Sequence, residues 1–204
     1  MKIGVLALQG DFALHGRALA RVRIDEAVES VEVRKPDQLD GLDGLDGLII
    51  PGGESTTLLK LMEHWGFWPA LQEFHAKGKA IFGTCAGAIL VAREVENPRQ
   101  PSLGLIDIDV ERNAYGRQRE SFEANGEADL GEPARLEMVF IRAPRIRRVG
   151  PGVRVLASHK DEPVMVREGD VLVATFHPEL TDDATVHAYF CRMAARAGAA
   201  SRRS

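Results

Sequence analysis

The stretch Ala80-Ile81-Phe82-Gly83-Thr84-Cys85-Ala86-Gly87-Ala88-Ile89-Leu90 decides how this chain folds. An apolar run ends at Gly83, a cysteine with small neighbours follows, and apolar helix-like positions continue through Val91. This order predicts a buried strand, a tight turn and a helix, with glycines where the backbone turns sharply. The thiol of Cys85 would then stand at a helix N-terminus, where free N–H groups favour a thiolate. A buried structural cysteine in a glycine-rich turn is the alternative that this stretch alone leaves open.

Strands and helices alternate on the N-terminal side of this stretch. Strands are expected at residues 2–8, 30–34 and 48–50, and helices at 13–22, 57–65 and 68–77. Such alternation predicts an α/β fold with a mostly parallel central sheet that has helices on both faces. Further along the chain, strand-like runs with few helices between them indicate some antiparallel strands in the C-terminal half, at residues 105–111, 135–141, 153–158, 163–167 and 171–176.

The length of 204 residues and the hydrophobic content of 45% fit one globular domain with a sizeable core. We expect this domain to span residues 1–197 and to end in a helix over residues 183–197. The small, basic segment 198–204 is predicted to be a disordered tail. Repeated Asp-Gly-Leu triplets within residues 40–48 predict a loop that leads into a strand.

The composition excludes several classes of protein. A formal net charge of -4 argues against a partner that is nucleic acid or a membrane surface. Two distant cysteines form no disulfide framework, and the chain shows neither a signal-peptide pattern nor an apolar run of transmembrane length. We therefore expect a cytoplasmic protein that acts on a small molecule. Cys191, among apolar residues of the last helix, is predicted to be a core side chain.

A second chemical group follows the apolar run 171–174, in the sequence Thr175-Phe176-His177-Pro178-Glu179. A strand-end imidazole can take a thiol proton and later protonate a leaving amine, while a carboxylate holds the ring in the required tautomer. In isolation, His-Pro-Glu is also a common surface turn. Because loops gather at the carboxyl ends of the strands in an open α/β sheet, Cys85, His177 and Glu179 are predicted to form a catalytic triad.

The elbow around Cys85 and the His-Pro-Glu segment together resemble the class I (triad) glutamine amidotransferases. Four further stretches make the chain similar to the glutaminase subunits of pyridoxal 5'-phosphate synthase: LALQGD at 6–11, PGGESTT at 51–57, ERNAYGRQ at 111–118 and FIRAP at 140–144. The resemblance extends from the first strand to Thr181 and so covers nearly the whole chain. It implies a flavodoxin-like fold of the glutamine amidotransferase type.

The resemblance also implies an activity. Family members hydrolyse L-glutamine to L-glutamate and ammonia through a cysteinyl thioester. The ammonia passes to a synthase subunit that makes pyridoxal 5'-phosphate, so the implied partner is this subunit in a hetero-oligomer. No metal and no bound cofactor are expected, because pyridoxal phosphate would be a product of the partner.

Acyl transfer of this kind needs an oxyanion hole and groups that bind the substrate. Backbone N–H groups of Gly52, Gly53 and Ala86 are the predicted oxyanion donors, since a Gly-Gly loop can turn its peptide toward a ligand. A strand-end arginine can hold the α-carboxylate of glutamine with two hydrogen bonds. The resemblance implies that the glutamine site is lined by Gly53, Glu54, Ser55, Arg112, Ile141 and Arg142.

Other interpretations remain open at this point. One is a cysteine hydrolase of the same elbow architecture or the glutaminase of another pathway; the His-Pro-Glu segment argues against the former, and residues 51–57 and 112–118 argue against the latter. Another is a non-catalytic regulatory subunit, against which the intact triad speaks. The loop 9–11 and the polar run 113–119 are the expected contacts with the synthase subunit.

Overall fold

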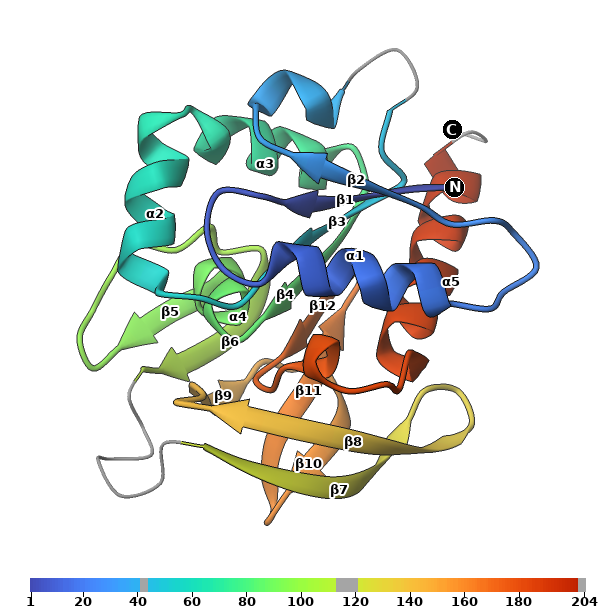
Figure 1. The fold of residues 1–204 in the computed structure, drawn as a ribbon. Coiled ribbons are helices and arrows are strands. Elements are labelled where there is room, and N and C mark those ends of the chain that lie inside the picture. Colours follow the sequence, from blue (N-terminus) through green and yellow to red (C-terminus); the bar gives the residue numbers. More distant parts are fainter. Residues whose placement is uncertain (41–43, 113–120, 202–204) are drawn as a thin grey trace.

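A mixed β-sheet forms the centre of the molecule (Figure 1). The computed structural model describes residues 1–40, 44–112 and 121–201. In spatial order, the strands of this sheet are β2 (Glu29–Val33), β1 (Lys2–Leu6), β3 (Gly47–Ile50), β4 (Ala80–Thr84), β12 (Val171–Ala174), β11 (Glu162–Glu168), β10 (Arg154–His159), β7 (Ser121–Asp129) and β8 (Pro133–Ile141). A smaller sheet contains β5 (Ala92–Glu96), β6 (Ile106–Glu111) and β9 (Arg145–Val149).

The central sheet has two halves with different pairing. Strands β2, β1, β3, β4 and β12 are mutually parallel, and we call them the parallel half. Strands β11, β10, β7 and β8 continue the sheet in antiparallel pairs and form the antiparallel half. The predicted α/β fold with antiparallel strands late in the chain is thus confirmed, and parallel pairing in this sheet ends at β12.

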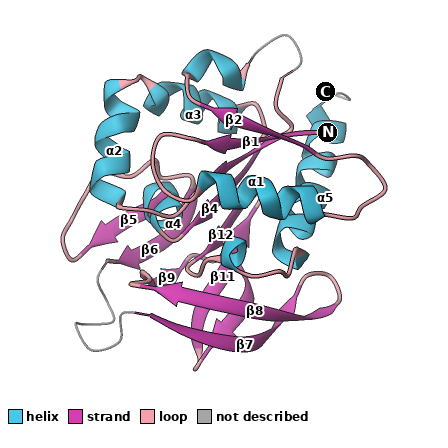
Figure 2. Ribbon diagram, in the orientation of Figure 1, coloured by secondary structure: helices cyan, strands magenta, loops and turns pink. Residues whose placement is uncertain are grey.

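Helices cover both faces of the parallel half (Figure 2). One face carries α1 (Phe12–Arg21) and α5 (Thr185–Ser201). The other carries α2 (Ser55–His64), α3 (Phe67–Ala76) and α4 (Ala86–Val91). Two short 3-10 helices complete the described elements, η1 (Pro36–Leu39) and η2 (Pro178–Leu180).

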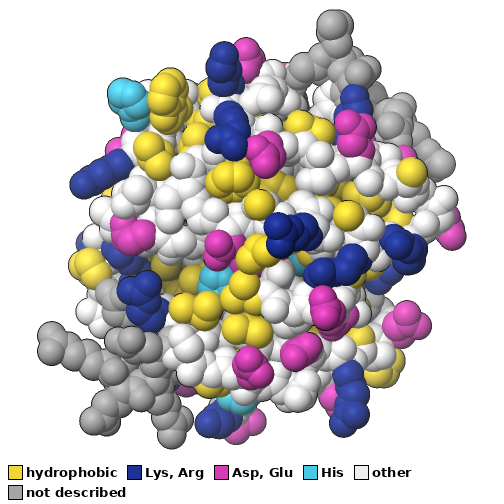
Figure 3. Space-filling model, viewed as in Figure 1, with side chains coloured by type: hydrophobic (Ala, Val, Ile, Leu, Met, Phe, Trp, Pro, Cys, Tyr) yellow, Lys and Arg dark blue, Asp and Glu magenta, His cyan; other side chains and the backbone are white. Residues whose placement is uncertain are grey.

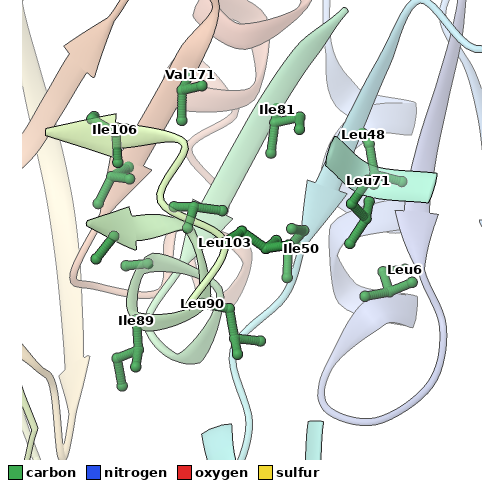
Figure 4. Packing of buried hydrophobic residues seen from close by; sticks show 14 of the residues in the cluster. Leu6, Leu48, Ile50, Leu71, Ile81, Ile89, Leu90, Leu103, Ile106 and Val171 are labelled. Atoms are coloured by element: carbon green, nitrogen blue, oxygen red, sulfur yellow. The ribbon is translucent and has the colours of Figure 1, made fainter. Parts of the chain in front are cut away.

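Side chains of the parallel strands alternate between these two helical layers, because successive residues of a strand point to opposite faces. In β3, Leu48 and Ile50 pack on the side of α2, α3 and α4, whereas Ile49 packs on the side of α1 and α5. Figure 4 shows Leu48 and Ile50 with Leu71 of α3 and Leu90 of α4. The strands are therefore buried on both faces, as their continuous apolar runs predict.

Some predicted boundaries were wrong. Strands β5, β7 and β9 were not predicted, and the strand expected at 171–176 ends at Ala174. The last helix was expected to end at residue 197, but α5 continues to Ser201 and takes in the first part of the predicted tail. A run of alanines and glycine with two flanking arginines allows this continuation, because alanine has the highest helix propensity.

The face of the molecule shown in Figure 3 carries charged side chains of both signs. None of the helices in the described ranges is both long and apolar enough to cross a bilayer. On the face shown in Figure 3, Lys and Arg side chains are intermixed with Asp and Glu side chains. This mixture agrees with the small net charge of -4.

Candidate active site

Cys85 occupies a strained turn between β4 and α4. Its backbone angles are φ 48° and ψ -101°, a combination that costs a residue with a side chain about 1–3 kcal/mol. The backbone N–H of Cys85 donates to Ala174 O of β12 at 2.9 Å, and Ile89 N donates to Cys85 O at 3.3 Å. The predicted strand, turn and helix are confirmed, and the thiol stands at the N-terminus of α4.

The glycines on either side of Cys85 serve close packing. A methyl group on Gly83 would lie 2.6 Å from Gly87 O, and one on Gly87 would overlap Ile50 O of β3. Neither glycine has a positive φ. The predicted role of the glycines, a sharp turn without clashes, is confirmed: Cys85 itself takes the strained angles, and the glycines let α4 approach β3 and β4.

His177 and Glu179 lie beside the elbow because β12 is the parallel neighbour of β4, with Ala174 opposite Thr84. His177 Nδ1 is 2.7 Å from Glu179 Oε1, and both side chains are buried. Burial lowers the pKa of His177, but hydrogen bonds to Cys85 and Glu179 outweigh it and raise that pKa from 6.5 to about 10. At neutral pH the ring is therefore an imidazolium between the sulfur of Cys85 and the carboxylate of Glu179.

A pocket of about 320 Å³ opens over Cys85 and His177. This volume lies in the range of small-molecule sites. The predicted substrate-binding residues all line the pocket: Gly53, Glu54, Ser55, Arg112, Ile141 and Arg142. It is also lined by residues that were not assigned to the glutamine site: Gln9, Asp11, Ile89 and Pro144. Of these, Gln9 and Asp11 had been expected only as contacts with a partner.

Two arginines bring positive charge to this pocket. Arg142 follows β8, has a positive φ of 41° and an exposed side chain. Arg112 follows β6, and its Nη2 donates to Thr56 Oγ1 at 3.1 Å and lies 3.7 Å from Glu54 Oε1. The pocket therefore offers one arginine held by α2 and one at its rim.

Glu54 has a structural partner within the protein. It is the N-cap of α2, and its carboxylate accepts hydrogen bonds from Thr56 N at 3.0 Å and Thr57 N at 2.7 Å. The hydroxyl of Thr57 also donates to this carboxylate, from Oγ1 to Oε2 at 2.7 Å. This bond first, and then the backbone bonds, lower the pKa of Glu54 from 4.5 to about 2. Its carboxylate thus compensates the free N–H groups of the helix. Its role in glutamine binding stays a prediction.

The Gly52-Gly53 loop packs against the catalytic pair. A methyl group on Gly52 would lie 2.5 Å from His177 Cε1 and 3.3 Å from Cys85 Cβ. The loop after β1 holds it from the other side, because Glu54 N donates to Gln9 Oε1 at 3.0 Å and a side chain on Gly10 would overlap Gly52 O. This link between the two loops was not predicted, although Gln9 and Gly10 belong to the LALQGD motif.

Some predicted features lie outside the described residues. These are the polar run 113–119, the corresponding part of the ERNAYGRQ motif, and residues 41–43 of the Asp-Gly-Leu triplets. Ala86, a predicted oxyanion donor, is the first residue of α4, where a backbone N–H has no partner within the helix.

Comparison with known proteins gives concordant matches over nearly the whole chain. The profile of the SNO glutamine amidotransferase family matches residues 5–196. The pyridoxal 5'-phosphate synthase subunit PdxT of Solibacter usitatus is 53% identical over 194 residues, which are 93% of this chain and 97% of that protein. The protein of the same name from Koribacter versatilis is 55% identical over 195 residues, 95% of each chain.

Solved structures agree at the level of the fold. A crystal structure of a glutamine amidotransferase superimposes with a TM-score of 0.85 at 50% identity and covers 95% of this chain and 98% of that chain. The structure of PurLQS from Thermotoga maritima superimposes with a TM-score of 0.65 at 14% identity and covers 96% of each chain. The second likeness shows a shared fold alone.

Proposed function

The chain belongs to the SNO glutamine amidotransferase family, and from that premise we propose how its pocket works as the glutaminase site of a pyridoxal 5'-phosphate synthase. The protein is the subunit that hydrolyses L-glutamine to L-glutamate and ammonia. It supplies the ammonia to a synthase subunit with which it forms a hetero-oligomer. The reaction is an acyl transfer from nitrogen to water.

One observation carries the assignment of the reacting groups. Cys85 lies on a strained elbow beside the His177–Glu179 pair, whose 2.7 Å hydrogen bond is buried. A nucleophile, a base and a carboxylate that orients the base are the groups that acyl transfer through a thioester requires. The pocket over them carries two arginines for a carboxylate substrate.

In the first half of the reaction, the Cys85 thiolate attacks the side-chain amide carbon of glutamine. The charge that develops on the amide oxygen is stabilised by backbone N–H groups from Ala86 and from the Gly52-Gly53 loop. His177 gives its Nε2 proton to the amide nitrogen, the C–N bond breaks, and ammonia leaves a thioester on Cys85.

In the second half, a water molecule attacks the thioester carbon. His177 takes one proton from this water, the C–S bond breaks, and the thiolate of Cys85 is restored beside an imidazolium. The new carboxyl group of glutamate loses its remaining proton to solvent. Glu179 keeps the His177 ring oriented in both halves.

The free subunit is proposed to be a poor glutaminase that its synthase partner activates, because ammonia made without an acceptor is lost. The support is the Gly52-Gly53 loop, which contacts both Cys85 and the loop that contains Gln9 and Gly10. Two backbone orientations of a Gly-Gly peptide are accessible, and a partner shifts them by its differential affinity. Docking near residues 9–11 could therefore act on the oxyanion donors.

The test is to measure ammonia release from glutamine with and without the purified synthase subunit. Strong release in the complex and weak release from the free subunit are expected. Equal rates would defeat the activation proposal and leave the glutaminase assignment standing. No release under either condition, with the synthase still using ammonium salts, would favour a non-catalytic regulatory subunit.

A cytoplasmic location is part of the proposal. Both cysteines, Cys85 and Cys191, are free thiols in the structure. A reducing compartment keeps a nucleophilic thiol in its active form. Fractionation of cells that express the tagged protein would test the location.

A further inference from the structure

Beyond Glu179, a row of buried polar side chains continues into the layer of α1 and α5. His15 of α1 and His187 of α5 have no exposed surface. His15 Nδ1 is 3.0 Å from His187 Nε2, and His15 Nε2 is 3.2 Å from Thr84 Oγ1 and 3.4 Å from Glu179 Oε2. The row therefore leads from the catalytic carboxylate to a pair of buried histidines.

The row of buried side chains ends near the second carboxylate oxygen of Glu179, Oε2. Glu179 Oε1 is bound by His177, but Oε2 is buried and, among the described residues, has no hydrogen bond. A buried carboxylate oxygen without a donor costs about 1–3 kcal/mol or more. The nearby Arg21 is directed elsewhere, to Thr181 O at 2.7 Å and Asp182 Oδ1 at 3.4 Å. His15 Nε2 lies 3.4 Å from Oε2 and 3.2 Å from Thr84 Oγ1, so a proton on Nε2 faces both oxygens.

Both buried histidines are neutral. Burial, then the nearby His187 and His177, keep the pKa of His15 well below 6.5. Burial, then the charge of Arg21, lower the pKa of His187 to about 3, against the opposing effect of Asp183. Each ring therefore carries one proton, on either nitrogen.

Two arguments place the proton of His15 on Nε2. An N–H at Nε2 faces the ionised Glu179 carboxylate, whereas a lone pair there would repel it. If the proton sat on Nδ1, His187 would have to accept at Nε2 and carry its own proton on Nδ1. That Nδ1 is buried and has no partner in the described part of the chain, and an orphaned buried N–H is rarer than an orphaned acceptor.

We propose that His15 is a positioning residue of the glutaminase reaction, which donates Nε2–H to Glu179 while His187 donates to His15 Nδ1. The hydrogen bonds then run in one direction, from His187 through His15 to Glu179, where they meet the bond from His177. Contacts of this kind are often long in a free enzyme and shorten in the substrate complex. The inference rests on the proposed function, since it concerns the orientation of the base in that reaction.

His15 would act through Glu179 on the geometry of His177. A carboxylate held at one oxygen can rotate, and rotation of Glu179 would carry the His177 ring away from Cys85. A donor at Oε2 fixes both oxygens. Because His15 is not among the residues that line the pocket, loss of its side chain should slow the chemical step and leave glutamine binding intact.

The experiment compares variants in the complex with the synthase subunit. His15→Leu removes both ring nitrogens and is expected to lower kcat by about 10- to 100-fold with little change in KM. His15→Gln keeps an N–H donor near the position of Nε2 and should recover most of the loss. His159→Leu is the matched control, because His159 packs on Phe122 and Phe140 away from this row. It should leave kcat unchanged.

A spectroscopic measurement keeps the proposal falsifiable if His15→Leu folds poorly. Nitrogen-15 spectra of histidine-labelled wild-type protein report which ring nitrogen bears the proton, and Nε2–H is expected at His15. A proton on Nδ1 of His15, or equal kcat in His15→Leu and wild type, would overturn the inference. Absence of glutaminase activity in the wild-type complex would instead defeat the proposed function, and the inference with it.

Discussion

The two halves of the central sheet contribute different parts of the pocket. The parallel half contributes the reacting groups: Cys85 follows β4, His177 follows β12 and the Gly52-Gly53 loop follows β3. The antiparallel half contributes a wall, since Ile141 ends β8 and Arg142 follows it, at the far end of the strand order. Neighbouring parallel strands must bring their carboxyl ends together, whereas β8 reaches the site only because the sheet curls back.

Two contacts join the halves at the site. His177 N donates to Val139 O of β8 at 2.8 Å, and Cys85 Sγ lies 3.9 Å from Ile141 O. The reacting groups and part of the substrate-binding surface therefore come from separable parts of the fold. Variants in the parallel half should then lower kcat, and variants in the wall should raise KM.

The largest effect is expected at the elbow. Cys85→Ala removes the nucleophile and should lower kcat by about 10^4-fold or more, with ammonia release as the measurement. Cys85→Gly should be equally inactive but more stable than Cys85→Ala by about 1 kcal/mol, because glycine accepts a φ of 48° without strain. Equal unfolding free energies of these two variants would show that the elbow stores no strain.

Variants of the base His177 and of its partner Glu179 should show the next largest losses of kcat. His177→Asn is expected to lower kcat by about 10^3-fold and Glu179→Gln by less, since Glu179 acts through the ring. The double variant should be little worse than His177→Asn, because triad members act as a unit. Losses that multiply would mean that Glu179 acts independently of His177.

Titration of His177, whose pKa is raised, is a second measurement on the His177–Glu179 pair. Because the pKa of about 10 exceeds the ordinary 6.5, the charged ring adds to the free energy of unfolding. This contribution is complete below about pH 6.5 and is lost as the pH rises through about 10. Glu179→Gln removes one of the two supports of the imidazolium, and the titration midpoint of His177 should fall. An NMR titration of the ring would measure the midpoint in the wild type and in Glu179→Gln. An unchanged midpoint would contradict the assigned pairing of His177 with Glu179.

The two arginines of the pocket, Arg142 of the antiparallel half and Arg112 after β6 of the small sheet, should give a smaller effect with a different signature. Arg142→Gln and Arg112→Gln are each expected to raise KM for glutamine by about 10- to 100-fold, the worth of a charge-assisted hydrogen bond, with kcat changed by less. Arg112→Gln should also loosen α2, because Arg112 bonds Thr56. A fall in kcat with KM unchanged would place these arginines with the reacting groups.

The parts of the site that could be predicted from the sequence are those that follow strands of the parallel half. Cys85 and His177 stand at the ends of apolar strands, so motif and topology predict their meeting from local residues. The β5 strand was missed because Ala92 follows Val91 of α4 with no turn residue between them. The β9 strand was missed because its residues, Arg145 to Val149, are mostly basic and pair as part of a small sheet.

Other features depend on distances that no local pattern contains. His15 lies 164 positions before Glu179, the difference of 179 and 15, and only the packing of α1 against η2 brings their side chains together. The cap made by Glu54 is a local motif, but its engagement limits a role in substrate binding that the family resemblance alone implies. Long-range packing thus decides which polar residues are free for a ligand.

The smallest effect is expected at Cys191, which lies in a helix packed on the parallel half and not at the end of one of its strands. Cys191 belongs to α5, has no exposed surface, and burial raises its pKa to about 12. A protonated thiol in the core is a poor nucleophile, so Cys191→Ala should leave kcat unchanged and cost about 1 kcal/mol of stability through lost packing. A glutamine-like electrophile should alkylate Cys85 and spare Cys191, with peptide mass spectrometry as the measurement. If the electrophile labelled Cys191 and activity were lost, the position of Cys85 in the elbow at the end of β4 would not explain which cysteine is reactive.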